Sequence, residues 1–301
     1  MRAYLTLLLS LAGIWGASFM FIEVALDDLA PTTLMFLRLL VAAVLLLGLM
    51  SVKHGVRGAA RELRGVGFST FALGIVNSAL PFTLIAWGQE HVDSGIAAIG
   101  NATMPIWIAV LAIWLVHSER ATGARLAGIA LGIVGTGVLT GAQPDVDAWA
   151  VVGTLAIVLA AVSYAAAALL LQRRMTRDPI TFSTAMTVGA TIALLPFGLV
   201  QAPHEAPGWK AIGSVLALGV AGTAIGVVIY TYLINEYGSF RAGLVTYLLP
   251  VTALLYGALL LDEQVNAWML LGLALILSGV ALGSGMLRPA RTREAVEPAR
   301  P

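Results

Sequence analysis

Residues 72–105 read ALGIVNSALPFTLIAWGQEHVDSGIAAIGNATMP, and residues 217–250 read ALGVAGTAIGVVIYTYLINEYGSFRAGLVTYLLP. The two stretches align without a gap at an offset of 145 residues, and after a one-residue deletion the register resumes at 144. The matched pairs include Ser78 with Thr223, Trp87 with Tyr232, Ser94 with Ser239, Pro105 with Pro250, Glu119 with Glu263, and Gly128 with Gly272. A common register over such a length indicates an internal repeat.

The composition places this repeat in a membrane. Hydrophobic residues make up 59% of the 301 residues and charged residues only 11%, with a mean hydropathy of +0.92. A soluble domain carries about 25% charged residues to face water. The chain has no cysteine, which excludes a disulfide framework, thiol catalysis and cysteine-ligated metals. We therefore expect an integral membrane protein.

Apolar runs long enough to cross a bilayer occur ten times, since about 20 residues span the hydrocarbon as a helix. The expected spans are 4–24, 31–52, 66–88, 95–116, 124–141, 149–171, 179–200, 210–234, 241–260 and 267–287. The first run is too long for a signal peptide and is interpreted as a retained span.

Basic residues predict the orientation of these spans. With the N-terminus inside, fifteen of the seventeen Lys and Arg residues fall on the cytoplasmic side, only Lys210 falls outside, and Arg38 lies within a span. Both termini are therefore expected on the cytoplasmic side, and the chain is expected to be a multi-pass membrane protein. Five is an odd number, so the two five-helix copies must be inverted relative to one another.

The expected fold is all-α, with ten transmembrane helices arranged as two inverted repeats. The first repeat covers 1–141, the second covers 149–287, and 288–301 forms a basic cytoplasmic tail. The tail is too short to house an ATPase, and no phosphate-binding loop is present, which argues against a primary pump.

Pro105 with Glu119, and again Pro250 with Glu263, are each followed by two glycines seven residues apart. Together with Trp15-Gly16 and the segment 31–38, this pattern resembles the EamA family of the drug/metabolite transporter superfamily, and most of all its bacterial aromatic amino acid exporters. The resemblance covers nearly the whole chain. It implies a ten-helix, multi-pass exporter of the bacterial inner (plasma) membrane that carries small metabolites, often amino acids. It also implies a central cavity between the first four helices of each half, with peripheral fifth and tenth helices.

Other classes fit the residues less well. The chain lacks the catalytic residues of an intramembrane enzyme, because no H-E-x-x-H motif and no mid-span histidine is present. A retinal protein needs a lysine within a span, whereas Lys53 and Lys210 lie at span ends. The leading prediction is a secondary transporter that exports amino acids, aromatic ones included, or similar small zwitterions by alternating access. Export of amphipathic drugs or metabolites ranks second, and a nucleotide-sugar or lipid carrier third. No cofactor, metal or nucleic acid is expected, and the protein is either a monomer or a homodimer.

Polar residues and helix breakers inside the hydrocarbon are the candidates for a substrate site. Pro105 and Pro250 occupy matching depths, as do Pro81 and Gly226, and matched breaks in the two halves are typical of a midplane site. The same residues could instead serve helix packing. The full predicted substrate-binding set is Trp15, Arg38, Asn77, Ser78, Phe82, Asn101, Pro105, Tyr164, Thr223, Tyr230, Tyr247 and Pro250.

The deep aromatic residues of this set could stack on an apolar substrate group or pack in the core. Glu23 and Arg38 are the charges most clearly embedded in spans, and they could pair with one another or contact the substrate. Arg38 is too deep to reach the interface easily, so a protein or substrate partner is favoured. With no other ionisable group at mid-span, the driving force stays open between facilitated diffusion and weak coupling through Glu23.

Gly128, Gly135, Gly272 and Gly279 form small-residue surfaces on the fifth and tenth spans. Glycines allow helices to approach closely. These surfaces predict either packing of the two helices within the chain or a dimer interface.

Overall fold

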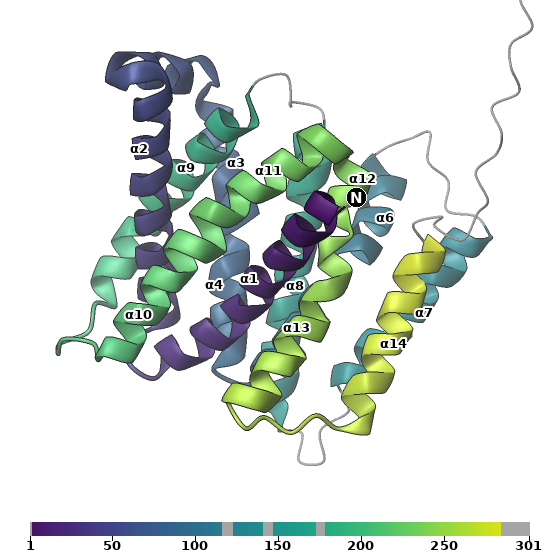
Figure 1. Cartoon of the computed structure of the whole chain (residues 1–301). Coiled ribbons are helices and arrows are strands. Elements are labelled where there is room, and N and C mark those ends of the chain that lie inside the picture. Colours follow the sequence, from purple (N-terminus) through teal and green to yellow (C-terminus); the bar gives the residue numbers. More distant parts are fainter. Residues whose placement is uncertain (1, 116–122, 141–146, 173–177, 284–301) are drawn as a thin grey trace, which may run out of the picture.

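The structure is a computed structural model that describes residues 2–115, 123–140, 147–172 and 178–283. In these residues all regular secondary structure is helical (Figure 1). The helices are α1 (Arg2–Leu26), α2 (Pro31–Gly65), α3 (Phe68–Gly74), α4 (Leu80–Gln89), α5 (Ser94–Asn101), α6 (Met104–Leu115), α7 (Ala124–Thr140), α8 (Ala148–Gln172), α9 (Pro179–Val200), α10 (Trp209–Ala217), α11 (Gly226–Tyr237), α12 (Ser239–Gly243), α13 (Val245–Leu260) and α14 (Ala267–Gly283), with π-helices η1 (Ile75–Ala79) and η2 (Leu218–Ile225). The predicted tail 288–301 and Glu119 lie outside the described residues.

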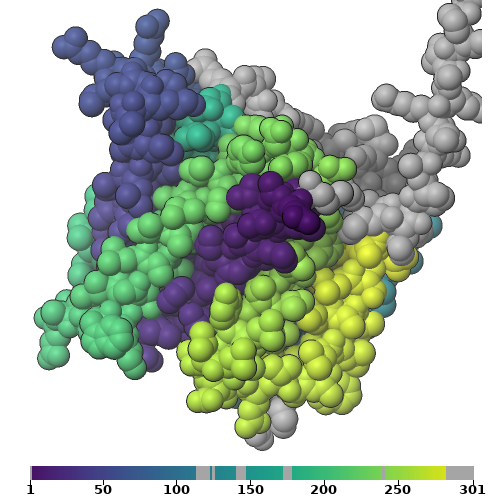
Figure 2. All heavy atoms as spheres, viewed as in Figure 1, coloured from purple at the N-terminus to yellow at the C-terminus, as the bar shows by residue number. Residues whose placement is uncertain are grey.

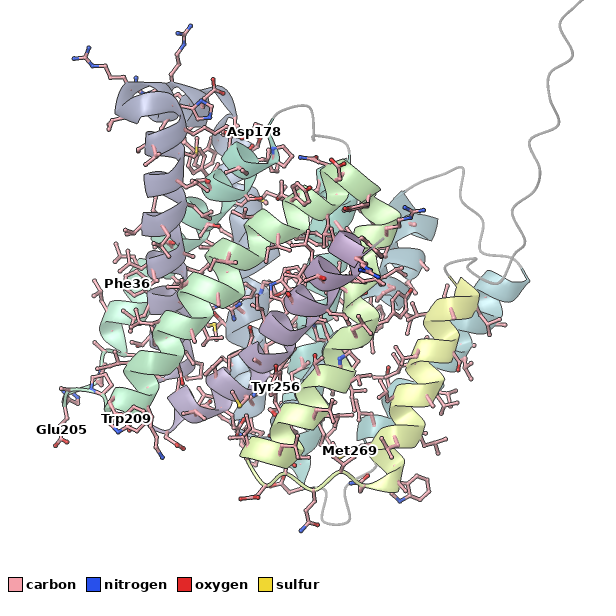
Figure 3. All side chains as sticks on the ribbon, viewed as in Figure 1. Phe36, Asp178, Glu205, Trp209, Tyr256 and Met269 are labelled. Carbon is pink, nitrogen blue, oxygen red and sulfur yellow. The ribbon has the colours of Figure 1, made fainter. Side chains whose placement is uncertain are left out.

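Ten helical segments of membrane character follow one another in the described residues. Eight are long and apolar enough to cross a bilayer, and the shorter apolar helices Leu126–Leu139 and Ala267–Leu282 complete the set. Successive segments run in opposite directions (Figure 1), so Asp178 lies at one end of the bundle while Glu205, Trp209 and Met269 lie at the other (Figure 3). The prediction of an all-α, multi-pass membrane protein with ten helices is confirmed.

Two of the spans contain a π-helix. The third span consists of α3, η1 and α4, and the eighth consists of α10, η2 and α11. When η1 is shifted by the repeat offset of 145 residues it falls on 220–224, which lies inside η2. Pro81 follows η1 and Gly226 follows η2, so the wide turns lie beside the breakers that the sequence singled out. π-helices are rare and occur often at functional sites.

The fourth and ninth spans are both interrupted, although not at the same depth. In the fourth span the break falls at Ala102 and Thr103, just before Pro105, as predicted. In the ninth span the break falls at Leu244, and Pro250 lies buried inside the continuous helix α13. The prediction that Pro250 breaks its helix at the depth of Pro105 is therefore wrong. A proline removes only one backbone donor, and the chain instead bends after Gly243, a residue of low helix propensity.

Helices α7 and α14 lie side by side at one edge of the bundle (Figure 1). A Cβ atom on Gly279 would lie 2.6 Å from the carbonyl oxygen of Gly128, so the two backbones touch. A Cβ on Gly135 would likewise lie 2.9 Å from the backbone nitrogen of Ile276. The glycine surfaces are thus used for packing within the chain, and the peripheral place of the fifth and tenth spans is confirmed.

Helix α2 is longer than the span 31–52 expected from hydropathy. It continues to Gly65 and contains a kink at Gly55, where φ is 70° and ψ is 159°. The part beyond the kink turns across the end of the bundle (Figure 1) and protrudes from it in Figure 2. Hydropathy did not predict this part, because Arg57, Arg61, Glu62 and Arg64 lie among its apolar residues.

Candidate functional site

Arg38 is the charged residue around which the site is built. It lies about two turns from the start of α2, and only 6% of its surface is exposed. Its Nε donates a hydrogen bond to Thr223 Oγ1 at 2.9 Å, and its guanidinium lies 4.0 Å from the centre of the Phe82 ring. The ion pair found in the described part of the chain is Lys53 with Asp178, so Arg38 has no carboxylate there within 4.0 Å. A positive charge is thus held inside the bundle by a hydroxyl and an aromatic face.

The π-helix η2 provides the hydroxyl. Thr223 Oγ1 accepts from Arg38 and donates to the carbonyl of Leu218, five residues earlier, at 3.0 Å. One residue before it, Gly222 lies so close to Arg38 that an added Cβ would be 3.7 Å from Nη2. The π-helix therefore places the Thr223 hydroxyl and the backbone of Gly222, which has no side chain, beside the guanidinium.

Trp15 and Tyr230 form the aromatic group beside η2. Trp15 Nε1 donates to the carbonyl oxygen of Gly222 at 3.0 Å, and the Trp15 and Tyr230 rings are 5.3 Å apart between centroids. Gly226 makes room for the indole, because a Cβ there would lie 2.5 Å from Trp15 Nε1. Three spans, the first, second and eighth, therefore converge on this point.

Phe82, the ring beside Arg38, also packs against a second aromatic residue, Tyr164. Their ring centroids are 6.4 Å apart in an edge-to-face arrangement. Ser163, the neighbour of Tyr164, donates to the carbonyl oxygen of Val76 in η1 at 2.7 Å. Helix α8 is thus tied to the first π-helix where its aromatic residue meets Phe82. Six predicted site residues come together in this way: Trp15, Arg38, Phe82, Tyr164, Thr223 and Tyr230.

The other predicted residues lie in the same helices or their neighbours without a direct contact to Arg38 in the described hydrogen bonds. Asn77 and Ser78 belong to η1, where Asn77 Nδ2 donates to Ser78 Oγ at 3.2 Å. Asn101 ends α5, and its Oδ1 is buried without a hydrogen-bond partner. Pro105 follows the break in the fourth span, Tyr247 packs against the main core from α13, and Pro250 is buried in α13.

Glu23 does not pair with Arg38. Gln89 Nε2 donates to Glu23 Oε2 at 3.1 Å and to the carbonyl oxygen of Phe19 at 2.9 Å. Sequence reasoning missed Gln89 because it lies at a predicted span end, where a polar residue needs no explanation. It also missed Gly222, whose role depends on a partner more than 200 residues away.

The loop between α13 and α14 contacts the start of α5. Glu263 accepts hydrogen bonds from the backbone nitrogens of Ser94 at 3.0 Å and Gly95 at 3.1 Å, the first two residues of α5. A carboxylate at a helix N-terminus satisfies free donors and complements the helix dipole. Burial raises the pKa of Asp93 beside it, and the negative charge of Glu263 raises that pKa further. Glu263 therefore holds the second half of the chain against the first at this end.

Glu263→Gln is expected to lower the free energy of unfolding by about 1–3 kcal/mol, since it removes the charge from two hydrogen bonds. The measurement is thermal unfolding of the purified protein in detergent. Glu205→Gln is the matched control, because Glu205 is an exposed acid on the same side of the bundle. If the two variants have equal melting temperatures, the Glu263 contact does not hold the two halves together.

The arrangement places a cationic group beside aromatic side chains, the two chemistries that recognise an anionic group and an apolar group. Among the described residues the hydrogen bond of Arg38 is made by Nε, and a guanidinium has terminal nitrogens that bind a carboxylate in a bidentate manner. Phe82 supplies an aromatic face to the Arg38 guanidinium, Tyr164 packs against Phe82, and Trp15 and Tyr230 form a second aromatic pair beside η2.

Comparison with known proteins agrees with this geometry. The EamA-like transporter family matches the chain twice, over residues 2–141 and 151–285. The chain belongs to this family. It is thus a multi-pass membrane transporter, and the suspected family resemblance is confirmed.

The EamA relatives that match over nearly their whole length include named amino acid exporters. A probable terminal-alkyne amino-acid exporter of Streptantibioticus cattleyicolor is 31% identical, with 95% of this chain and 94% of the relative covered. A probable amino-acid metabolite efflux pump of Salmonella typhimurium is 29% identical, with 93% and 94% covered. The transporter YoaV of Bacillus subtilis is 24% identical, with 92% and 95% covered.

One solved crystal structure has a similar fold. It superposes with a TM-score of 0.68 and covers 96% of this EamA chain and 98% of its own, at 17% sequence identity. At that identity the likeness concerns the fold alone.

Proposed function

We propose that this EamA protein is a secondary transporter that exports amino acids, aromatic ones included, or similar small zwitterions across the bacterial inner membrane. The observation that carries the proposal is the buried guanidinium of Arg38, which has a hydroxyl and an aromatic ring as partners and no carboxylate within 4.0 Å among the described residues. A buried charge is costly unless it is paired. The carboxylate of an amino acid would supply the missing partner.

An acceptor for the ammonium group is also available. Asn101 Oδ1 is buried without a hydrogen-bond partner. Its helix α5 packs against α8, which carries Tyr164, and against α13, which carries Tyr247. We assign recognition of the ammonium to Asn101 and of the side chain to the four aromatic residues around Arg38.

Alternating access of two inverted repeats, 1–141 and 149–287, is the mechanism that we propose. Both termini would lie in the cytoplasm, as the distribution of Lys and Arg favours. The match of one family to each half and the paired π-helices in the third and eighth spans support the repeat. In such transporters one repeat rocks against the other around a fixed site.

Flux into proteoliposomes tests the proposed function. Labelled phenylalanine is compared with phenethylamine, which lacks the carboxylate, with and without an imposed proton gradient. We expect at least tenfold faster flux of the amino acid, because only the amino acid pairs with Arg38. Equal flux of both compounds, or flux of a cationic dye without amino acid flux, would favour the second candidate, an exporter of amphipathic compounds with an aromatic-lined site.

Asn101→Ala and Tyr230→Ala test where the substrate binds. Each is expected to raise the KM for phenylalanine about tenfold, the effect of losing one hydrogen bond or one aromatic contact of roughly 1.4 kcal/mol. Trp209→Ala is the control, because Trp209 is an exposed aromatic residue at one end of the bundle (Figure 3) and makes none of the described contacts of the site. Unchanged kinetics in both site variants would place the site elsewhere.

A further inference from the structure

The segment of α2 beyond the kink has a structure of its own. Gly55 and Gly67 bound it with φ of 70° and 79° and extended ψ of 159° and 155°. Almost only glycine adopts this backbone conformation, so the chain turns sharply at both positions. The helical residues 56–65 between them therefore form a short separate helix at the end of the second span (Figure 1).

This short helix is amphipathic. Arg57, Arg61 and Arg64 follow one another at intervals of four and three residues, so they share one face, and all three are exposed. Val56 and Leu63 are seven residues apart on a different face, and Ala59 is buried against the protein. We call the three arginines the arginine face.

No acidic group of the described chain neutralises the arginine face. The nearby ion pair joins Lys53 to Asp178 and involves none of the three arginines. Glu62 is the acid within the helix, and it lies about 100° around the helix axis from Arg61. Three exposed guanidinium groups therefore face outward, and the group that binds them must be anionic.

Large apolar side chains are also exposed around the helix, and they indicate where it lies. Val52 is 87% exposed, Val56 75% and Phe68 85%. Val52 and Val56 lie where the second span ends and Phe68 lies where the third begins, the positions at which spanning helices would meet the membrane–water interface. Helices with a basic face and an apolar face lie in this interface. A soluble acidic protein would match the arginines but would leave the apolar residues in water.

We propose that residues 56–65 form an interfacial helix whose arginine face binds the phosphates of anionic phospholipids in the adjoining leaflet. Arg groups bind phosphate oxygens in a bidentate manner, and juxtamembrane basic clusters attract anionic headgroups. The site is separate from Arg38, so it does not depend on the identity of the transported substrate.

Native mass spectrometry of the full chain tests the lipid site. The protein is titrated with phosphatidylglycerol or phosphatidylcholine, and the bound lipid is counted. We expect at least fivefold more phosphatidylglycerol on the wild type, a ratio that falls as salt rises because the contact is electrostatic. The triple variant R57Q/R61Q/R64Q is expected to bind both lipids equally, whereas Lys210→Gln, at the opposite end of the bundle, keeps the preference.

A triple variant that retains the preference, or a wild type without one, overturns the proposal. The three arginines are exposed, so the triple variant is expected to keep the melting temperature of the wild type in phosphatidylcholine nanodiscs. Should that temperature fall, the three single variants are compared, each with an expected partial loss of the phosphatidylglycerol excess. If each single variant keeps the same phosphatidylglycerol excess as the wild type, the proposal is likewise overturned.

Discussion

Arg38→Gln is expected to reduce amino acid flux about 10- to 100-fold while the protein stays as stable as the wild type or becomes more stable. Hydrogen bonds to a charged group contribute about 1.5–3 kcal/mol, which corresponds to that range of flux. The stability follows from the same geometry, because Arg38 is a buried charge without a described carboxylate partner. Its removal saves the cost of keeping a charge out of water.

The two readouts distinguish a substrate-binding arginine from a structural one. Flux is measured in proteoliposomes with labelled phenylalanine, and stability is measured by thermal unfolding of the same preparation. Arg38→Lys retains the charge without the planar fork and is expected to give an intermediate flux. Lys210→Gln serves as the control for loss of one positive charge. A parallel fall of flux and melting temperature in Arg38→Gln would make the residue structural and remove the main support for carboxylate recognition.

Gly189→Leu is expected to prevent correct folding. An added Cβ at Gly189 would overlap the carbonyl oxygen of Phe71, and one at Gly74 would overlap the carbonyl oxygen of Met186. Helices α3 and α9 therefore touch backbone against backbone, and a side chain there has no flexible neighbour to displace. Insertion of a bulky side chain into such a contact costs more than about 3 kcal/mol. The readout is the monodisperse fraction in size-exclusion chromatography after extraction in detergent.

Gly48→Leu is the matched control, because nothing lies within 4 Å of a Cβ at Gly48. Both glycines lie inside spanning helices, so the change in helix propensity is the same in the two variants. They differ in the room that the surrounding atoms leave for the new side chain. The control is expected to match the wild type in yield and melting temperature. A well-folded Gly189→Leu protein would show that α3 and α9 are packed less closely than the structure has them.

The fold could be predicted to a large extent from the sequence, because the bilayer imposes a strong constraint on the chain. Each span needs a long apolar run whose backbone bonds are satisfied within the helix, and such runs are visible one at a time. The predicted end of the second span was wrong because its apolar residues stop before the helix α2 stops. The predicted break at Pro250 was wrong because this proline lies inside the continuous helix α13.

The site could be predicted only in part. Arg38 and the deep aromatic residues stood out because such residues are costly or unusual in hydrocarbon. Which of the candidates contact one another could not be predicted, although Thr223 and Phe82 were themselves among the predicted residues. Thr223 lies 185 residues from Arg38, and Glu263 lies 169 residues from Ser94, so no local pattern relates them. Gln89 and Gly222 are ordinary residues until their neighbours are known.

The sequence by itself therefore determined the medium, the ten helices and the internal repeat, because each depends on local hydropathy and on a register that can be read along the chain. The tertiary structure decided which polar groups meet. It showed that Arg38 is held by Thr223 and Phe82 rather than by Glu23, and that the bend of the ninth span is at Leu244. Those outcomes depend on how helices far apart in the chain pack together, and the sequence of a single segment does not determine the free energy of such contacts.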